Sequence, residues 1–577
     1  MTEYDIVIRQ GTIIDGLRTP RFVADIGVRD GRIVHIGRIP AAEGRTVVDA
    51  EGLVVAPGVV DLHTHYDAQV FWDPYCTMSS WHGVTSVVIG NCGFGLAPVT
   101  PEARDRAMLT LSRNEAISLD SMREGLPRPW PWVSFPEFLD AIDATPKGVN
   151  MLSYVGLAPV MTYVMGLEAA KNRPATSGEK AEMAAILDEA LEAGACGWST
   201  QWSGENGVQL DYDGTPMVTD TMAEEDLYVF AEVLGKRREG FIQLTGDGGY
   251  GPEEARRIQE RIAEISGRPV LYNVLALGVD QHGQATSNHH DVMQWLDDVN
   301  ARGRRIFGQA VTVPLGYEFT LEDWNLYDTS PIWREATLGT VEERAAKLRD
   351  PERRAAMRAE YDAGQHRGAP FAGTIAQLTV ESVRERELEP FEGLTVAELA
   401  EREQKHVVDA MLDVAGVRLD TTYVTPWQPI DMTEMKRLAN SPFALPGTSD
   451  GGAHTKFLTM ATYPTYYLAT LVRDNKIMDL EQAHWRLSAY PALAAGFKDR
   501  GWIREGAPAD IIVYDLDELE ILPREMVYDQ PAGSWRRIQR SRGYRWVMVN
   551  GEITFEDGDC TGATPGTLLR HGAANPA

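Results

Sequence analysis

Two histidines one residue apart follow an apolar run near the N-terminal end of the chain. The run Gly58–Leu62 is typical of a buried strand, and it continues into His63-Thr64-His65. Residues two apart on a strand point to the same side, so both imidazoles would face one way, and such a pair readily binds a metal. The alternative is two histidines in an ordinary turn. The buried strand before them and the strands after them favour a metal site.

A cysteine follows the next apolar run. Thr85–Ile89 leads into Gly90-Asn91-Cys92-Gly93-Phe94-Gly95. A thiolate beside zinc ionises readily, and it can ligate one metal or bridge two. A free cysteine considered alone is more often a small, inert core residue. Because the histidine pair stands at the neighbouring strand end, we expect Cys92 to be a ligand.

An aspartate follows a much later apolar run. Ala444–Ser449 precedes Asp450-Gly451-Gly452-Ala453-His454. Near a metal-bound water, the Asp450 carboxylate could accept a proton as general base and return it to the leaving group. The alternative is a turn aspartate before glycines. His454 is either an extra ligand or transition-state contact, or a polar loop residue.

Strand and helix patterns alternate through the middle of the chain, which indicates parallel βαβ units. Eight such units predict an α/β fold with a (β/α)₈ TIM-like barrel over residues 57–495 and its active site at the carboxyl ends of the strands. The expected strands are Gly58–Leu62, Thr85–Ile89, Val149–Val155, Cys196–Thr200, Phe241–Thr245, Pro269–Val274, Arg305–Val313 and Ala444–Ser449. The clearest helical patterns are Ser177–Ala193, Ala223–Arg237, Pro252–Ile265 and Ser287–Ala301.

Three segments fall outside this alternation. Charged helical runs at Thr340–Asp362 and Val396–Val414 predict an insertion around residues 315–440. Residues 1–56 and 496–560 both read as strands and turns, so we expect one small β-sandwich built from both ends of the chain. Residues 561–577 have the composition of a loosely ordered tail.

The composition narrows the class of function. The chain has 577 residues, 44% of them hydrophobic, and a net charge of −29. So acidic a protein is expected to be soluble and to bind neither nucleic acid nor membrane, which leaves a small-molecule substrate. Four scattered cysteines, no signal peptide and no long apolar run predict a cytoplasmic protein. We also expect a homo-oligomer, although the charge itself gives no indication of one.

The other histidines and the aromatic residues give weaker indications. His289-His290 follow a helix-capping pattern and are expected in a solvated first turn. The remaining histidines considered are expected to be structural or surface residues: His35, His82, His366, His406, His484 and His571. Trp72, Tyr75 and Trp202 could line an apolar substrate pocket, and plain packing is the alternative.

The sequence resembles the amidohydrolase superfamily and, within it, the N-acyl-D-amino-acid deacylase (D-aminoacylase) family. The resemblance spans nearly the whole chain and rests on YDIVIRQGTIIDG, APGVVDLHTHYD, WHGVTSVVIGNCGFGLAP, GTSDGG and REGAPADIIVYD. It implies a metal-dependent hydrolase with a barrel and a β-sandwich. By position it implies that His63 and His65 are ligands, that Cys92 is a ligand or bridge, and that Asp450 is the catalytic acid/base.

Two departures from the family pattern alter what it implies. The family's histidines on the fifth and sixth strands are absent, and the strands read Phe241-Ile242-Gln243-Leu244-Thr245 and Leu271-Tyr272-Asn273-Val274-Leu275. Catalytic zinc normally needs three protein ligands. We therefore predict about one Zn²⁺ per chain, or another divalent metal, held by His63, His65, Cys92 and Asp450.

The second departure concerns the substrate. The family's sixth-strand lysine, which helps to hold a substrate carboxylate, is missing, and only Lys456 lies close to the expected position of an arginine. A desolvated carboxylate needs a cation or a cluster of donors, so a neutral amide, lactam, lactone or ester is a better candidate than an N-acyl-D-amino acid. The candidate substrate contacts are Trp72, Tyr75, Trp202, Gln243, Asn273, His454 and Lys456.

The sequence therefore predicts an amidohydrolase that cleaves an amide-type C–N bond of a small molecule with metal-activated water and Asp450 as general acid/base. Two other activities stay open: an N-acyl-D-amino-acid deacylase proper and a lactone or ester hydrolase. A third alternative is a metal-free relative that only binds a ligand.

Overall fold

Eight parallel strands follow one another in chain order through the middle of the molecule. The computed structural model describes residues 3–571 apart from 206, 208, 247–250, 278–287, 323–325, 367–372 and 428–429. The eight strands, the third in two pieces, are β6 (Val59–Asp61), β7 (Val84–Ile89), β8 (Asn150–Ser153) with β9 (Val155–Gly156), β10 (Gly197–Gln201), β11 (Phe241–Thr245), β12 (Val270–Leu275), β13 (Ile306–Ala310) and β17 (Ala444–Pro446). Each lies within or overlaps one of the eight predicted runs.

The strands are divided between two sheets, and no single closed barrel is recorded. One sheet has the order β6-β7-β8 and the other β17-β13-β12-β11-β10-β9. Backbone contacts link the two: Tyr154 N–H donates to the Ile89 carbonyl, and Thr64 pairs in parallel with Gly451 just beyond β6 and β17. The first and last strands are thereby brought together, and the residues that follow them meet.

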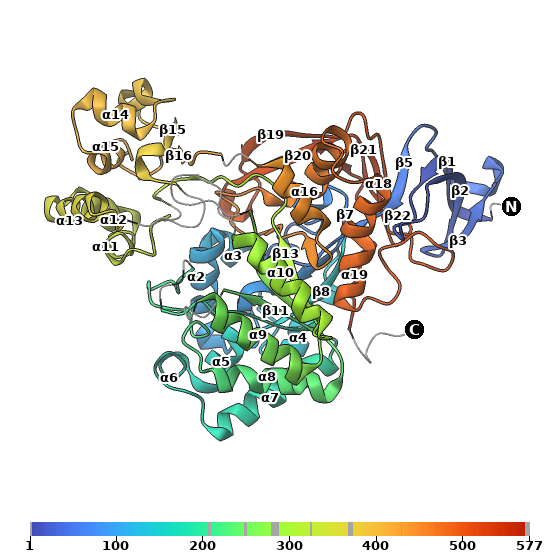
Figure 1. Ribbon diagram of the computed structural model, residues 1–577, viewed down its shortest axis with the longest axis horizontal. Helices are drawn as coiled ribbons and strands as arrows, with labels where there is room; N and C mark the ends of the chain where they lie inside the picture. Colours follow the sequence, from blue (N-terminus) through green and yellow to red (C-terminus); the bar gives the residue numbers. More distant parts are fainter. Residues whose placement is uncertain are drawn as a thin grey trace.

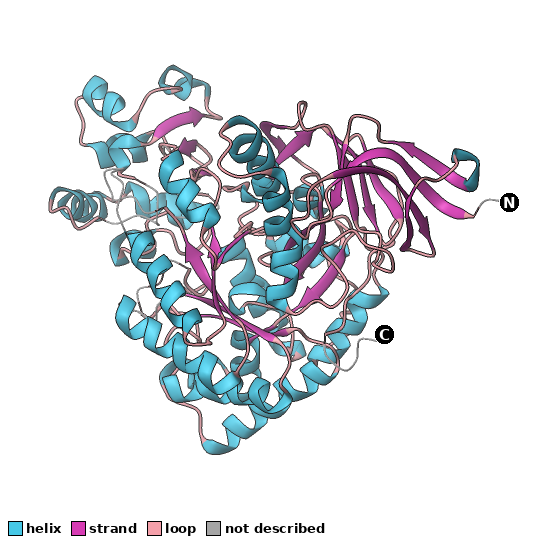
Figure 2. Ribbon diagram, turned by 45° about the vertical axis from the view of Figure 1, so that its right-hand side comes forward, coloured by secondary structure: helices cyan, strands magenta, loops and turns pink. Residues whose placement is uncertain are grey.

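Helices pack outside the parallel strands (Figures 1 and 2). Those between successive strands are α2 (Arg104–Glu115), α3 (Leu119–Gly125), α4 (Phe135–Ala144), α5 (Leu157–Met165), α6 (Leu167–Asn172), α7 (Ser177–Glu192), α8 (Glu224–Arg237), α9 (Pro252–Ser266), α10 (Asn288–Ala301) and α16 (Met432–Asn440). The four helices predicted from periodicity are α7 to α10, shifted by at most two residues. Local sequence explains their starts: Thr176 and Glu179 form a capping box on α7, and Pro252 occupies the first turn of α9.

After β17 the chain continues through short helices into the C-terminal strands. These helices are α17 (Tyr463–Tyr466), α18 (Leu480–His484) and α19 (Tyr490–Ala495), with π-helical turns at Tyr467–Asp474 and Trp485–Ala489. A further short helix, α1 (Thr77–Ser80), lies between β6 and β7.

Strands from the two ends of the chain share one nine-stranded sheet. Its members are β1 (Tyr4–Ile13), β2 (Phe22–Arg29), β3 (Arg32–Gly37), β4 (Gly44–Asp49), β5 (Val54–Pro57), β18 (Ile511–Tyr514), β21 (Tyr544–Val549), β22 (Glu552–Glu556) and β23 (Asp559–Cys560). β5 joins the two sets because Val54 pairs with Tyr514. Both ends of the chain thus contribute to one β-domain, at one end of the molecule (Figure 2), and its packing as a sandwich stays a prediction. It is built as one sheet with a separate two-stranded ribbon, β19 (Glu520–Val527) and β20 (Arg536–Arg542).

A lobe formed by residues 317–425 stands apart from the parallel strands (Figure 1). This insertion lobe contains α11 (Pro331–Ala336), α12 (Val341–Arg349), α13 (Pro351–Asp362), α14 (Val396–Glu403) and α15 (Val407–Asp413) around a small sheet of β14 (Glu318–Phe319), β16 (Thr422–Val424) and β15 (Thr379–Ser382). It has a hydrophobic cluster of its own. Each predicted helical run is two helices. Pro351 cannot continue α12 and instead begins α13, with Asp350 as its cap.

The C-terminal segment is more ordered than its composition suggested. Pro565 pairs with Lys147 and Leu568 pairs with Met151 of β8, and Leu569 N–H donates to the Met151 carbonyl over 2.6 Å. The expectation of a loosely ordered tail is wrong for residues 565–571, because this segment adds to the edge of β8. Residues 572–577 lie outside the described part of the chain.

The structure also bears on the membrane and disulfide expectations. Among the described residues, no helix combines the length and apolarity needed to cross a bilayer. Cys76, Cys92, Cys196 and Cys560 are all free.

Candidate active site

Three of the predicted ligands meet at the carboxyl ends of β6 and β7. One ligand atom from each of His63, His65 and Cys92 lies within 4.8 Å of the others, and all three side chains are buried. The two histidines follow β6 and the cysteine follows β7, so parallel pairing of these strands brings them together. Cys92 Sγ is 3.5 Å from His63 Nε2.

Asp450, which follows β17, completes the cluster. Its Oδ1 is 3.2 Å from His63 Nε2 and 3.7 Å from His65 Nε2. Bond lengths to zinc of about 2.0–2.3 Å in a tetrahedron imply separations of about 3.3–3.6 Å between ligand atoms. The separations of 3.2 and 3.7 Å from Asp450 Oδ1 to the two histidines, and of 3.5 Å between Cys92 Sγ and His63 Nε2, fall close to this range. Two imidazoles, a thiol and a carboxylate so placed fit one divalent cation.

The backbone at three of these positions adopts an uncommon conformation. Cys92 has φ 57°, Asp450 φ 47° and His454 φ 51°, in the left-handed region that non-glycine residues seldom occupy. Gly93, next to Cys92, has φ 77°, and a Cβ there would lie 2.7 Å from the Thr200 Cα. Such conformations concentrate at functional sites, where the surrounding structure holds them. Here they turn the side chains at the strand ends toward one another.

Two further residues orient the imidazoles. Gln309 Oε1, from β13, lies 3.0 Å from His63 Nδ1. Glu115 Oε1, at the end of α2, lies 3.5 Å from His65 Nδ1, and its Oε2 lies 3.6 Å from His454 Nδ1. Each ligand histidine thus has a partner for Nδ1 and presents Nε2 to the centre, the arrangement usual for metal-binding histidines.

Sequence reasoning missed both partners. Glu115 is fully buried, and a carboxylate in that position is costly unless it is paired. Its position in an ordinary charged helix gives no sign of burial, so only the three-dimensional contact reveals it. Gln309 lies inside a predicted strand near its carboxyl end, and the argument used for the histidine pair could have found it.

The charged groups of the cluster shift one another's pKa values. Burial opposes ionisation, but Cys92 and Asp450 raise the pKa of His63 to about 10. Burial raises the pKa of Cys92, and the two histidines outweigh it and lower that pKa to about 7. The pKa of Asp450 lies well below its usual range because hydrogen bonds from both histidines overcome burial. The thiol and carboxylate are thereby prepared as anions for a cation.

Neutral side chains occupy the opposite side, at the ends of β11 and β12. Gln243 Oε1 accepts the Cys92 backbone N–H over 2.8 Å, and its Nε2 donates to Thr245 Oγ1 over 2.7 Å. Thr245 Oγ1 is also 3.3 Å from Cys92 Sγ. Asn273 Nδ2 donates to Thr245 Oγ1 over 3.4 Å. Of the candidate substrate contacts, Gln243 and Asn273 therefore adjoin the metal ligands, as does His454, whose Nε2 is 4.0 Å from Asp450 Oδ2.

The four other candidates lie elsewhere. Trp72 donates to Gln530 Oε1 over 3.0 Å, and Tyr75 packs edge-on against Phe555 of β22, so both face the C-terminal strands. The ammonium group of Lys456 lies over the Trp535 ring. Trp202 is 1% exposed within the main core and donates to the Met222 carbonyl.

His289 and His290, at the start of α10, do not both lie in solvent as the sequence predicted. His289 is buried, and both His289 Nε2 and His290 Nε2 approach Glu434 Oε2 of α16, at 2.9 and 2.5 Å. The expected solvated first turn is therefore wrong for His289, because α16 packs over it. His82 and His484 are buried structural residues, as expected: His82 bonds Thr465 and the Gln539 carbonyl, and His484 bonds Tyr514.

Comparison with known proteins agrees with this architecture. The model of the amidohydrolase family named Amidohydro_3 matches residues 46–555. An N-acyl-D-aspartate deacylase and a D-aminoacylase of Alcaligenes xylosoxydans xylosoxydans are 28% and 27% identical, each over 99% of this chain and 96% and 98% of their own. The solved N-acyl-D-glutamate deacylase of Bordetella bronchiseptica, complexed with zinc and a phosphonate inhibitor, is 25% identical with a TM-score of 0.67, covering 98% of this chain and 100% of its own.

These matches assign the chain to the amidohydrolases by sequence and by fold. The chain belongs to the amidohydrolase family, and its relatives within that family are of the D-aminoacylase type. It is a hydrolase that acts on carbon–nitrogen bonds other than peptide bonds.

Proposed function

We propose that this protein hydrolyses a neutral amide or cyclic amide with one divalent cation held by His63, His65, Cys92 and Asp450. The observation that carries the proposal is that His63, His65 and Cys92 offer ligand atoms within 4.8 Å of one another, with Asp450 Oδ1 3.2 Å from His63 Nε2 and 3.7 Å from His65 Nε2. The zinc in the related N-acyl-D-glutamate deacylase supports the choice of metal. We further propose that β6 to β13 and β17 together form the (β/α)₈ barrel over residues 57–495, flanked by the β-domain of residues 1–56 and 496–560.

When bound, the cation would polarise the scissile carbonyl and lower the pKa of water. The protein's own groups manage the protons. Asp450 Oδ1 faces the ligand histidines, and Oδ2 faces His454 at 4.0 Å. Asp450 can therefore hold a proton taken from water on Oδ2 and pass it to the leaving nitrogen. His454, supported through Nδ1 by Glu115 and the Asn114 carbonyl, would orient that carboxylate and contact the substrate.

The surroundings favour a substrate without a carboxylate. Gln243, Thr245 and Asn273 supply hydroxyl and amide groups beside the metal ligands, with no positive charge. A carboxylate bound there would lose its water without gaining a cation, a loss of several kcal/mol. The net charge of −29 also disfavours the approach of an anion.

A substrate panel tests the proposal. N-acetyl-D-amino acids, their neutral methyl esters or amides, and apolar lactams and lactones would be assayed with the zinc-loaded enzyme. We expect the neutral amides and lactams to be the better substrates. Turnover of the free acids at about 10⁴ M⁻¹s⁻¹ or better would contradict the neutral-substrate proposal. An N-acyl-D-amino-acid deacylase would then be the correct activity, and lactone-only turnover would identify an ester-type hydrolase.

Elemental analysis tests the metal directly. We expect about one zinc equivalent per chain after reconstitution. No bound metal would instead favour a ligand-binding relative without activity, and two tight equivalents would contradict the single-ion site. Location in the cytoplasm and assembly into a homo-oligomer stay predictions.

A further inference from the structure

An apolar pocket lies directly beside the candidate metal centre. Its cavity volume is about 100 Å³, and its lining comes from the segment after Cys92, from α2, from α5 and from residues 211–218. These segments follow β7, β9 and β10 on the same rim as the ligands.

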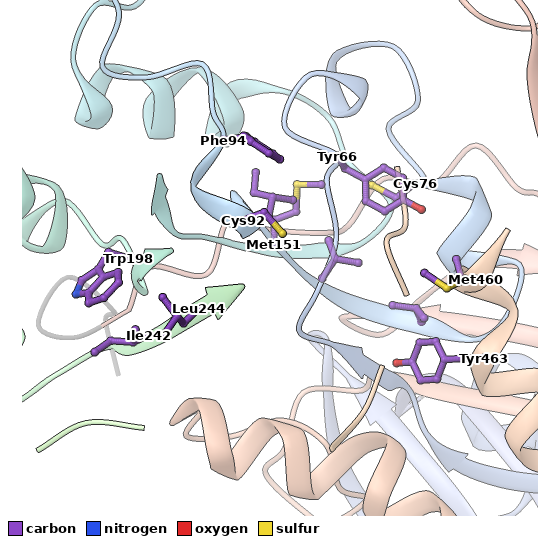
Figure 3. Packing of buried hydrophobic residues seen from close by; sticks show 14 of the residues in the cluster. Tyr66, Cys76, Cys92, Phe94, Met151, Trp198, Ile242, Leu244, Met460 and Tyr463 are labelled. Atoms are coloured by element: carbon purple, nitrogen blue, oxygen red, sulfur yellow. The ribbon is translucent and has the colours of Figure 1, made fainter. Parts of the chain in front are cut away.

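Phe94 belongs to both the pocket and the metal centre. It lines the pocket, and its ring centroid lies 6.5 Å from that of His65. Figure 3 shows the Phe94 and Cys92 side chains in the same buried cluster, between Trp198 on one side and Tyr66 on the other. A substrate with its carbonyl beside His65 can therefore extend one arm past Phe94.

Two alanines keep the pocket open along α2. Ala103, just before the helix, and Ala107 and Leu111, within it, follow one another at four-residue spacing and all line the pocket. Ala158 and Pro159 of α5 form the facing wall, with Met217 and Val218. Larger side chains at the alanine positions would fill this space.

The polar end of the pocket carries no net charge. Arg106 and Lys171 both bond Asp211, and both approach Asp213. Two cations and two carboxylates thus balance, and Thr110 donates to Asp211 as well. An anionic arm would compete with carboxylates already in place, whereas an alkyl arm would only displace water from apolar walls.

We propose that this pocket binds the apolar acyl or alkyl arm of the substrate, so that the enzyme prefers neutral amides with a long hydrocarbon chain. This inference rests on the proposed function, because it places the scissile carbonyl of that reaction at the metal centre. It narrows the substrate to amides with an apolar chain, which the metal site alone does not specify.

A chain-length series tests the proposal. The substrates are neutral N-acyl amides of one amine, with acyl chains from two to twelve carbons, assayed with zinc-loaded enzyme. We expect KM to fall about threefold to fourfold for each methylene that enters the pocket, the gain usual for burying one CH₂. Ala107→Trp should abolish this gain for long chains, because the indole ring would fill the space that the chain occupies.

The controls separate packing damage from loss of the pocket. Ala107→Leu is a smaller enlargement that should shorten the longest favoured chain if the tryptophan variant does not fold. Ala185→Trp places the same ring on an exposed position of α7, and it should keep the full dependence on chain length. A dependence unchanged in both Ala107 variants, or absent from the unmodified enzyme, overturns the proposal.

Direct binding distinguishes this failure from failure of the proposed function. The affinity of the same amides for the zinc-loaded protein would be measured by calorimetry. Binding that strengthens with chain length without hydrolysis would keep the pocket and refute the amidase activity. Hydrolysis without any effect of chain length would keep the activity and refute the pocket.

Discussion

The two sides of the candidate site differ in kind, although both are ends of parallel strands. After β6 and β7 stand two imidazoles and a thiol that together with Asp450 suit a cation. Within β11 and β12 lie Gln243 and Asn273, whose neutral amides bond a shared hydroxyl, that of Thr245. One architecture therefore presents a charged half and a neutral half. The difference teaches that a position at a strand end does not by itself make a residue a metal ligand. The type of side chain at that position decides whether a cation can be held there.

Removing the charged half should have the largest effect. We expect His63→Ala, His65→Ala and Cys92→Ala each to lose both metal and activity, because each variant removes one of the four donors proposed to hold the cation. Metal content by elemental analysis and turnover would be measured together. Cys196→Ala is the matched control, since Cys196 is also a buried free cysteine. A His63→Ala protein that retained one tight zinc would place the metal elsewhere.

Asp450→Asn should leave the fold intact and lower turnover by roughly 10²–10⁴-fold, the range for a lost general acid/base. Because Asp450 Oδ1 lies 3.2 Å from His63 Nε2, some loss of metal is also expected. Measuring turnover per bound zinc separates the two roles. Near-normal turnover per zinc would exclude Asp450 as the proton carrier.

Glu115→Gln should weaken metal binding by about 10–100-fold, as loss of a carboxylate partner of a ligand histidine usually does. The variant keeps the shape of the side chain, so its melting temperature serves as the check on folding. Glu102→Gln is the control, because Glu102 is exposed shortly before α2. The readout is zinc affinity by competition with a chromophoric chelator, and an unchanged affinity would show that Glu115 only fills space.

The smallest expected effect concerns a histidine with neutral partners only. Burial lowers the pKa of His82 to about 4, against about 6.5 in an unfolded chain. Between these values the unfolded state binds more protons, so stability is full above pH 6.5 and falls as the pH drops toward 4, by up to about 3 kcal/mol. Melting temperature against pH, compared with His82→Gln, measures this contribution. If both proteins lose stability in parallel as the pH falls, His82 does not contribute to the pH dependence, and the prediction is wrong.

Much of the fold followed from sequence because its signals are local. Periodicity and capping residues defined α7 to α10 within two residues, and short apolar runs marked all eight parallel strands. The single nine-stranded sheet was less accessible, because a strand pattern does not reveal its partners. The order of residues 565–571 was missed for the same reason: it depends on an open edge at β8, which no local feature of the tail encodes.

The residues of the candidate site also fall into those that local sequence could predict and those that it could not. His63, His65, Cys92 and Asp450 could be grouped because each follows a strand whose end points to one rim. Glu115 and the burial of His289 depend on helix packing at long sequence separation, with α2 against the strand ends and α16 over α10. Trp72 and Tyr75 illustrate the converse error, since proximity in sequence to His65 did not bring them to the site.

The pairing of β5 with β18 has a consequence for synthesis of the chain. Val54 and Tyr514 are neighbours in the sheet, yet a ribosome makes the first long before the second. At typical elongation rates, β5 would wait roughly 20–90 s for its partner. During that interval β5 has an open edge, which can pair with another chain. We therefore expect yield in cells to depend on chaperones that shield nascent strands.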